Sequence, residues 1–171
     1  RIHTQFTGHP SQTHTVTMAE MDQPDKLALL RRIWTAPESF KPRQTNRDIT
    51  EAAARSFAAL AQGLCASSGL QPQPVAHFLT QCVFCFFAED VGLLPGRMLE
   101  RLVNNKNITP ERLTQGLGQL FAAMQTGGLY GVDDIAWFNG GLFQSIAVPP
   151  LSAPQVAELR TAAALDWSAI D

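Results

Sequence analysis

The segment VAHFLTQCVFCFFAEDV, at 75–91, constrains the fold more than any other part of the sequence. Apolar side chains fall on nearly every side of a helix drawn through it, which is typical of a central helix that is surrounded by others. Gly92 supplies the glycine that commonly stands just past a helix end. The sequence therefore predicts a buried helix that starts near Pro72 or Pro74 and ends before Gly92.

Two cysteines, Cys82 and Cys85, lie three positions apart inside this helix and share one face. A structural zinc site takes four ligands, and the only other candidates are Cys65 and His77. A thioredoxin-like pair needs a strand before it and a helix that begins at the first cysteine, which this pattern lacks. We therefore expect core packing for this pair rather than metal or redox chemistry, because free cysteines are among the most buried residue types.

Two acidic residues, Glu89 and Asp90, stand at the end of the same helix. Adjacent helical residues point about 100° apart, so these carboxylates cannot hold one reacting group between them as a paired acid and base would. A stripe of side chains more polar than their surroundings also runs along this helix at steps of four: His77, Gln81, Cys85 and Glu89. Two interpretations stay open. The stripe is either a rim that meets solvent or a buried hydrogen-bonded seam, in which Glu89 holds an arginine or a helix N-terminus of another segment.

The first seventeen residues predict a β-hairpin. RIHTQFT alternates apolar or β-branched with polar side chains, THTVT is β-branched, and the turn-prone GHPSQ separates the two. Two strands alone are marginal in water, so we expect the hairpin at 1–17 to belong to the sheet of a preceding domain.

From Thr17 onward the apolar residues follow a helical period. A capping box of Thr17 and Glu20 precedes an expected inward stripe formed by Leu27, Leu30, Ile33 and Trp34. Further helices are expected from Thr45 or Thr50 to Gly69, at 97–103, at 109–125, and at 153–164 behind a Ser152 and Gln155 box. The predicted fold is all-α, a bundle of about six helices with an N-terminal hairpin, and its helical domain covers 18–165.

A second conspicuous stretch is WFNGGLF, at 137–143. Asn139, Gly140 and Gly141 tolerate positive φ, so we expect the backbone to turn tightly there against packed neighbours. Phosphate-binding glycine loops follow a strand and open a helix, often with Lys and Ser or Thr after the glycines, whereas a leucine and Phe143 follow here. We therefore expect a structural motif, to which the buried helix contributes Cys82, Cys85, Phe86, Glu89, Asp90 and Gly92.

The composition of the chain limits the classes of function that it can have. With 45% hydrophobic and 16% charged residues, the 171-residue chain is globular, and its net charge of −2 gives no sign of nucleic acid. No apolar run reaches the roughly 20 residues of a membrane helix, and nothing resembles a signal peptide. Three cysteines, an odd number, fit a reducing compartment. We expect a cytoplasmic protein that does not enter membranes.

Basic residues nevertheless gather in two short regions. The first group is Arg31, Arg32, Lys41, Arg43 and Arg47, and the second is Arg97, Arg101, Lys106 and Arg112. Such groups are commonly solvated faces. The first group is also the candidate for contact with a DNA backbone, which is the alternative function for this chain.

Three stretches, HFLTQCVFCFFAEDVGLLP, WFNGGLF and AALDWSAID, follow the hairpin in that order and resemble a known family. They are similar, over nearly the whole chain, to the segment between the nuclease and methyltransferase domains of MmeI-like type IIL restriction-modification enzymes and related class I DNA methyltransferases. The resemblance implies a bacterial parent protein with a PD-(D/E)xK-type nuclease, this helical spacer, an S-adenosylmethionine-dependent adenine-N6 methyltransferase and a target-recognition domain. It also implies Mg²⁺ for a nuclease, and a link to the methyltransferase domain that starts at 166–171.

The catalytic motifs of that family have no matching positions in this chain. No Asp or Glu is followed two positions later by Lys, Asn-Pro-Pro-Tyr is absent, and no glycine-rich loop follows a strand pattern. We therefore expect a non-catalytic spacer, without cofactor or metal of its own, that orients the nuclease and methyltransferase domains on double-stranded DNA. An independent enzyme built around Cys82 and Cys85 is the least favoured function, because no base, nucleophile and third group stand at a usable spacing.

Overall fold

The computed structural model describes every residue except Leu70, Asn139 and Asp171, and its contacts divide the chain into two compact units. The first unit is Arg1–Glu51 with Ala169–Asp171, and the second is Ala52–Ser168. Helix α2 (Asn46–Ser68) begins in the first unit and continues into the second. The domain boundaries expected at 17/18 and 165/166 stay predictions.

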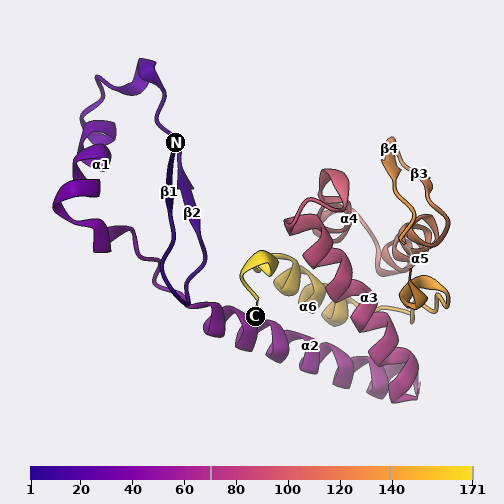
Figure 1. The fold of residues 1–171 in the computed structure, drawn as a ribbon. Helices are drawn as coiled ribbons and strands as arrows, with labels where there is room; N and C mark the ends of the chain where they lie inside the picture. Colours follow the sequence, from indigo (N-terminus) through magenta and orange to yellow (C-terminus); the bar gives the residue numbers. More distant parts are fainter. Residues whose placement is uncertain (70, 139, 171) are drawn as a thin grey trace. The chain divides into compact units, whose positions relative to one another are not determined.

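The first unit joins a hairpin to a helix (Figure 1). Strands β1 (Ile2–Thr4) and β2 (Gln12–His14) are antiparallel, with Ile2 opposite His14, and they confirm the predicted hairpin. A 3-10 turn (Met18–Glu20), helix α1 (Pro24–Thr35) and a second 3-10 turn (Pro37–Phe40) follow. The buried Phe40 ring meets the edge of His14 at 5.2 Å and the guanidinium of Arg32 at 4.9 Å, so this ring is the centre of a small core.

The expected inward stripe of the first helix is confirmed at Leu30 and Ile33, which are half-buried, and wrong at Leu27 and Trp34. The Thr17 and Glu20 box is present, but it caps the 3-10 turn, and α1 starts only at Pro24. Trp34 is 86% exposed and Leu27 is 48% exposed. A two-stranded hairpin covers only a narrow strip of a helix, and the half-buried positions are Lys26, Leu29, Leu30 and Ile33.

The second unit packs helices around α3 (Pro72–Asp90), as Figure 1 shows. The remaining helices are α4 (Met98–Asn104), α5 (Pro110–Thr126) and α6 (Ala153–Ala163). Buried side chains occur on several sides of α3, among them Phe78, Cys82 and Phe86. With α1 and α2, the described part of the chain contains six α-helices, which confirms the predicted fold class. None of its helices is long and apolar enough to cross a bilayer.

Helix ends follow the predicted signals. Gly69 and Gly92 adopt φ of +63° and +77° just past α2 and α3. Thr109 Oγ1 accepts the backbone N–H of Arg112 at the start of α5. The Ser152 and Gln155 capping box is present at the start of α6. Local backbone and capping chemistry therefore fixes these boundaries.

A second hairpin, β3 (Gly128–Tyr130) and β4 (Asp133–Ile135), was not predicted from the sequence. Gly131, at φ +65°, makes its turn. Tyr130 Oη donates to the carbonyl of Gly116 in α5 at 3.2 Å, and Arg101 of α4 pairs with Asp133 at 2.8 Å. Strands of three residues are too short to show an alternation in the sequence, so only the glycines could have indicated this hairpin.

The backbone does turn at Gly140 and Gly141, but neither glycine uses the positive φ that the sequence analysis expected. Gly140 is extended at φ 171°, and Gly141 begins a 3-10 turn (Gly141–Phe143). A Cβ at either glycine would meet nothing within 4 Å, and Asn139 lies outside the described residues. The packing in this stretch comes instead from the buried Phe143 ring, whose centroid is 5.6 Å from that of Phe121.

Candidate functional site

The cysteine pair belongs to the core. Cys82 and Cys85 are both fully buried, and the Cys85 thiol donates to Met124 Sδ at 3.4 Å. Burial raises the pKa of both thiols well above the ordinary value, so neither forms a thiolate at neutral pH. Among the described residues, no three His, Cys, Asp or Glu side chains gather closely enough to hold a metal ion.

The polar stripe of α3 is a buried seam. Gln81, which has no exposed surface, donates to the carbonyls of Leu142 and Ser145 at 2.8 and 2.9 Å. His77 Nε2 also lies 2.9 Å from the Ser145 carbonyl. These contacts tie α3 to a segment more than 60 residues away in the chain, so the stripe is a structural joint rather than a solvated rim.

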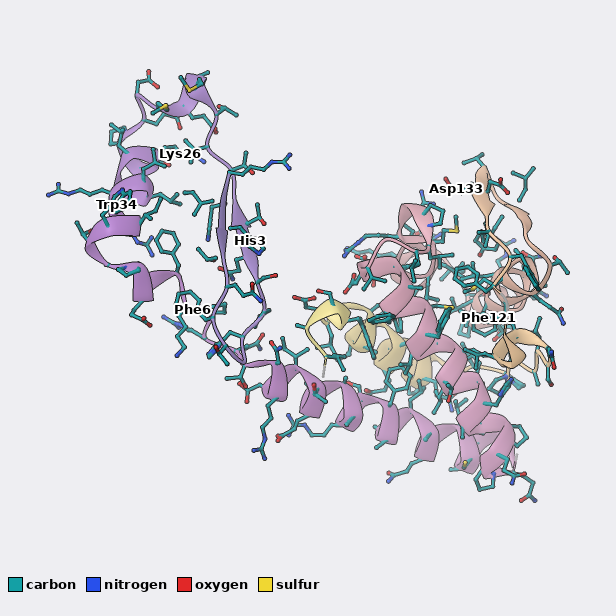
Figure 2. All side chains as sticks on the ribbon, in the orientation of Figure 1. His3, Phe6, Lys26, Trp34, Phe121 and Asp133 are labelled. Atoms are coloured by element: carbon teal, nitrogen blue, oxygen red, sulfur yellow. The ribbon has the colours of Figure 1, made fainter. Side chains whose placement is uncertain are left out.

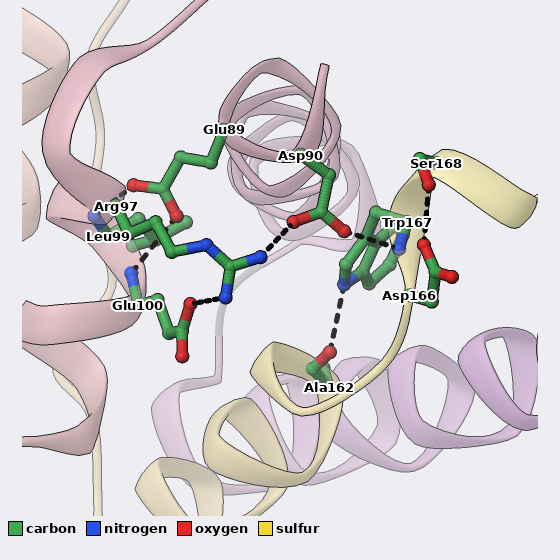
Figure 3. A network of polar contacts seen from close by, with 9 residues as sticks. All are labelled: Glu89, Asp90, Arg97, Leu99, Glu100, Ala162, Asp166, Trp167 and Ser168. Atoms are coloured by element: carbon green, nitrogen blue, oxygen red, sulfur yellow. Dashed lines mark hydrogen bonds and ion pairs between the residues drawn. The ribbon is translucent and has the colours of Figure 1, made fainter. Parts of the chain in front are cut away.

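Glu89 continues this seam at the end of α3 and caps another helix (Figure 3). Its carboxylate accepts the backbone N–H groups of Leu99, and of Glu100 at 3.2 Å, in the first turn of α4. The residue before α4 is Arg97, which has φ 49° and makes no side-chain cap. Glu89 therefore satisfies N–H groups that the local sequence leaves open, as one of the two sequence-based interpretations expected.

Glu89 is 7% exposed, and this burial has an electrostatic consequence. Desolvation raises the pKa of its carboxyl from 4.5 to about 6, although the hydrogen bonds from Leu99 and Glu100 act in the opposite direction. At neutral pH the carboxylate form faces the helix N-terminus.

Asp90 joins three segments of the second unit, as the dashed lines of Figure 3 show. Its Oδ1 accepts from Arg97 at 2.8 Å, and its Oδ2 accepts the backbone N–H of Trp167 at 2.7 Å. Arg97 also pairs with Glu100 at 2.6 Å. Glu89 and Asp90 thus serve different partners, which agrees with the expectation that they do not share one reacting group.

Trp167 anchors the segment after α6. Its ring is 4% exposed, stacks on Phe86 at 5.3 Å and meets Phe57 edge-on at 5.6 Å. Its Nε1–H donates to the carbonyl of Ala162 at 2.9 Å. Sequence reasoning noted this tryptophan only as part of a family-like stretch and missed its role in the core. A lone large aromatic residue shortly after a helix end was the available signal.

A polar hollow of about 390 Å³ opens beside this network. Its lining residues are Asp90, Arg97, Glu100, Ala163, Ala164, Leu165, Asp166 and Ser168. The charged groups are engaged with each other or with the backbone, and Ser168 Oγ donates to Asp166 at 2.6 Å. No histidine or cysteine is among these lining residues. These contacts can hold the end of α3, the loop before α4 and the segment after α6 together.

The two groups of basic residues differ in how many of their side chains are paired with carboxylates. Every member of the first group is exposed and lies in the first unit. Arg32 is engaged by Ser39 and Phe40, and Arg47 by Glu51. The other three are Arg31, Lys41 and Arg43. None of them forms an ion pair with the residues that the structure describes. In the second group, Arg97 and Arg101 are committed to carboxylates.

The comparison with protein families gives a match to part of the chain. The family model described as "MmeI, helicase spacer domain" matches residues 73–143, from α3 to the 3-10 turn at Gly141–Phe143. No curated protein and no solved structure matches the chain. The matched range holds the polar seam, Glu89, Asp90 and Arg97. The segment at 73–143 is therefore similar to the MmeI helicase spacer domain.

Proposed function

We propose that the second unit is a rigid, non-catalytic connector that orients the nuclease and methyltransferase domains of an MmeI-like restriction-modification enzyme on double-stranded DNA. The family match supports the spacer role in such an enzyme. S-adenosylmethionine, and Mg²⁺ where a nuclease is present, belong in this proposal to the whole enzyme. The nuclease and methyltransferase activities of the whole enzyme, and its cytoplasmic location, are parts of the same proposal.

The observation that carries the proposal is the position of Asp90. One carboxylate holds the end of α3, the loop before α4 and the backbone at Trp167. Because the Trp167 ring is also buried against Phe86, the segment after α6 is anchored to the core of the second unit. A packed joint transmits orientation, whereas a flexible linker would not.

Pulsed electron paramagnetic resonance on the chain tests this rigidity. Spin labels on noncanonical amino acids at the exposed positions Gln119 and Ser168 report the position of the exit relative to α5. We expect one narrow distance distribution, and a clearly broader one in Asp90→Ala, because that change releases both Arg97 and the Trp167 N–H. The matched control is Asp134→Ala, at an exposed carboxylate, which should leave the distribution unchanged. A broad distribution in the unmodified chain would make the exit a hinge and refute the rigid connector.

Contact with a DNA backbone by the first unit is the second candidate function. Residues 26–47 contain six Lys and Arg side chains against one acidic residue, Glu38, which gives this stretch a charge of +5. Arg31, Lys41 and Arg43 are exposed, and the described chain neutralises none of them. Unpaired, exposed cations are suited to phosphates because they need not break an existing ion pair.

Salt dependence of binding tests this second function. Replacing Arg31 and Arg43 by alanine should weaken binding to any duplex sequence and lower the slope of log K against log salt by about 2, because two phosphate contacts are lost. Fluorescence anisotropy with a random-sequence duplex at several salt concentrations measures both quantities. Arg112→Ala, at an exposed arginine of the second unit, is the matched control and should change neither. An unchanged slope in the double variant would exclude phosphate contact by these side chains.

A further inference from the structure

We propose that Trp34 is a stacking site for an unpaired base of a nucleic-acid strand whose phosphates are held by the free cations of the first unit. This inference deepens the second candidate function and rests on it. Trp34 lies in the last turn of α1 (Figure 2) and is 86% exposed. The fold makes no use of this ring, although large aromatic rings are usually buried or engaged in recognition.

The geometry of α1 places a cation beside the ring. Lys26, Leu29, Leu30 and Ile33 form the half-buried face, whereas Leu27, Arg31 and Trp34 are exposed. The exposed residues follow one another at spacings of four and three, so they form one row along the outer face. Arg31 precedes Trp34 by one turn, which corresponds to about 5–6 Å between Cβ atoms. A phosphate bound by Arg31 therefore keeps the adjoining base within reach of the indole.

Charge favours a polyanion over an apolar protein surface as the occupant. The stretch at 26–47 around Trp34 carries six basic side chains and one acidic side chain. Lys26 and Arg47 pair with Glu20 and Glu51, which leaves four basic side chains around the ring without a carboxylate partner among the described residues. Cationic grooves with exposed aromatic rings bind single-stranded nucleic acid, because phosphates meet the cations while bases stack on the rings. In an intact duplex, neighbouring bases cover both faces of each base. An unpaired base offers a free face and is thus the favoured ligand.

The second unit provides a matched contrast. Trp137 is also exposed, at 61%, but it follows the acidic pair Asp133 and Asp134. Asp133 is already paired with Arg101, and the exposed Asp134 carboxylate repels phosphates, so this ring should add nothing to nucleic-acid binding. Trp137→Ala therefore removes an exposed indole of the same chain without removing the proposed site.

Three labelled probes of equal length test the proposal by fluorescence anisotropy: a mixed-sequence single strand, an abasic strand with the same phosphates, and a blunt duplex. We expect the unmodified chain to bind the mixed strand about tenfold more tightly than the abasic strand. Trp34→Ala should abolish that preference without altering the salt slope or the affinity for the duplex. Trp137→Ala should keep the preference. Circular dichroism of each variant verifies that it is folded.

Two results would overturn the stacking site: equal affinity of the unmodified chain for mixed and abasic strands, or a preference that survives in Trp34→Ala. Equal affinities combined with a steep salt slope would remove only the stacking site and leave the phosphate contact. Absence of binding to all three probes at low salt would overturn the stacking site and the phosphate contact together.

Discussion

Replacement of Trp167 by alanine is expected to lower the free energy of unfolding of the second unit by about 3–5 kcal/mol, which is the range for removing a large buried aromatic ring. The ring stacks on Phe86, contacts Phe57 edge-on and donates to the Ala162 carbonyl. The variant loses all three contacts and leaves a cavity between α2, α3 and the end of α6. Urea titration followed by far-UV circular dichroism measures the loss.

Two variants separate this core effect from other consequences of removing tryptophan. Trp137→Ala removes a 61% exposed ring and should cost less than about 1 kcal/mol. Trp167→Phe should recover part of the loss because it restores an aromatic contact with Phe86 but not the indole N–H bond. Equal urea midpoints for Trp167→Ala and Trp137→Ala would show that the segment after α6 is not held by the core.

Replacement of Glu89 by alanine should cost the second unit about 2 kcal/mol at neutral pH. The N–H groups of Leu99 and Glu100 then lose their acceptor, and the loss of a helix cap costs about 0.5–2 kcal/mol while hydrogen bonds to charged groups contribute more. Removal of a desolvated charge offsets part of that loss. Chemical denaturation measures the change. Glu111→Ala, at an exposed carboxylate in the first turn of α5, is the control and should cost clearly less.

The same carboxyl makes stability depend on pH. Its pKa is raised from 4.5 to about 6 on folding, so the folded chain binds this proton more tightly than the unfolded chain does. The resulting stabilisation is complete below about pH 4.5 and is lost as pH rises through 6. With allowance for solvent screening it amounts to about 1 kcal/mol. Denaturation at pH values from 4.5 to 7 should show this decrease, and Glu89→Gln should lack it. An identical pH profile in the variant would contradict the role of Glu89.

Much of the helical framework could be predicted because its signals are local. The apolar stretch at 75–91, the glycines after α2 and α3, and the box at Ser152 each act over a few residues. The role of Glu89 could be narrowed to two interpretations, since its i+4 stripe placed it beside polar neighbours. Which helix it would cap could not be predicted, because Leu99 reaches it only through the turn between α3 and α4.

Features that depend on distant partners escaped prediction. The burial of Trp167 depends on Phe57 and Phe86, which lie 110 and 81 positions earlier in the numbering. The exposed position of Trp34 depends on how little of α1 the hairpin covers. Apolar periodicity identified α1 as a helix but could not tell which apolar residues would find a neighbour, because the covering element sets the width of the buried face.

The cap that the Glu89 carboxylate of α3 places on α4 also bears on the order in which the second unit folds. A helix of seven residues is too short to persist alone in water, since isolated helices shorter than about 12–15 residues are marginal. Its first-turn N–H groups find their acceptor only when the end of α3 is already helical and presents Glu89. Glu89 and Leu99 are ten positions apart, so closing the loop between them costs little chain entropy. We therefore expect α4 to form on α3 and to acquire protection from hydrogen exchange after α3.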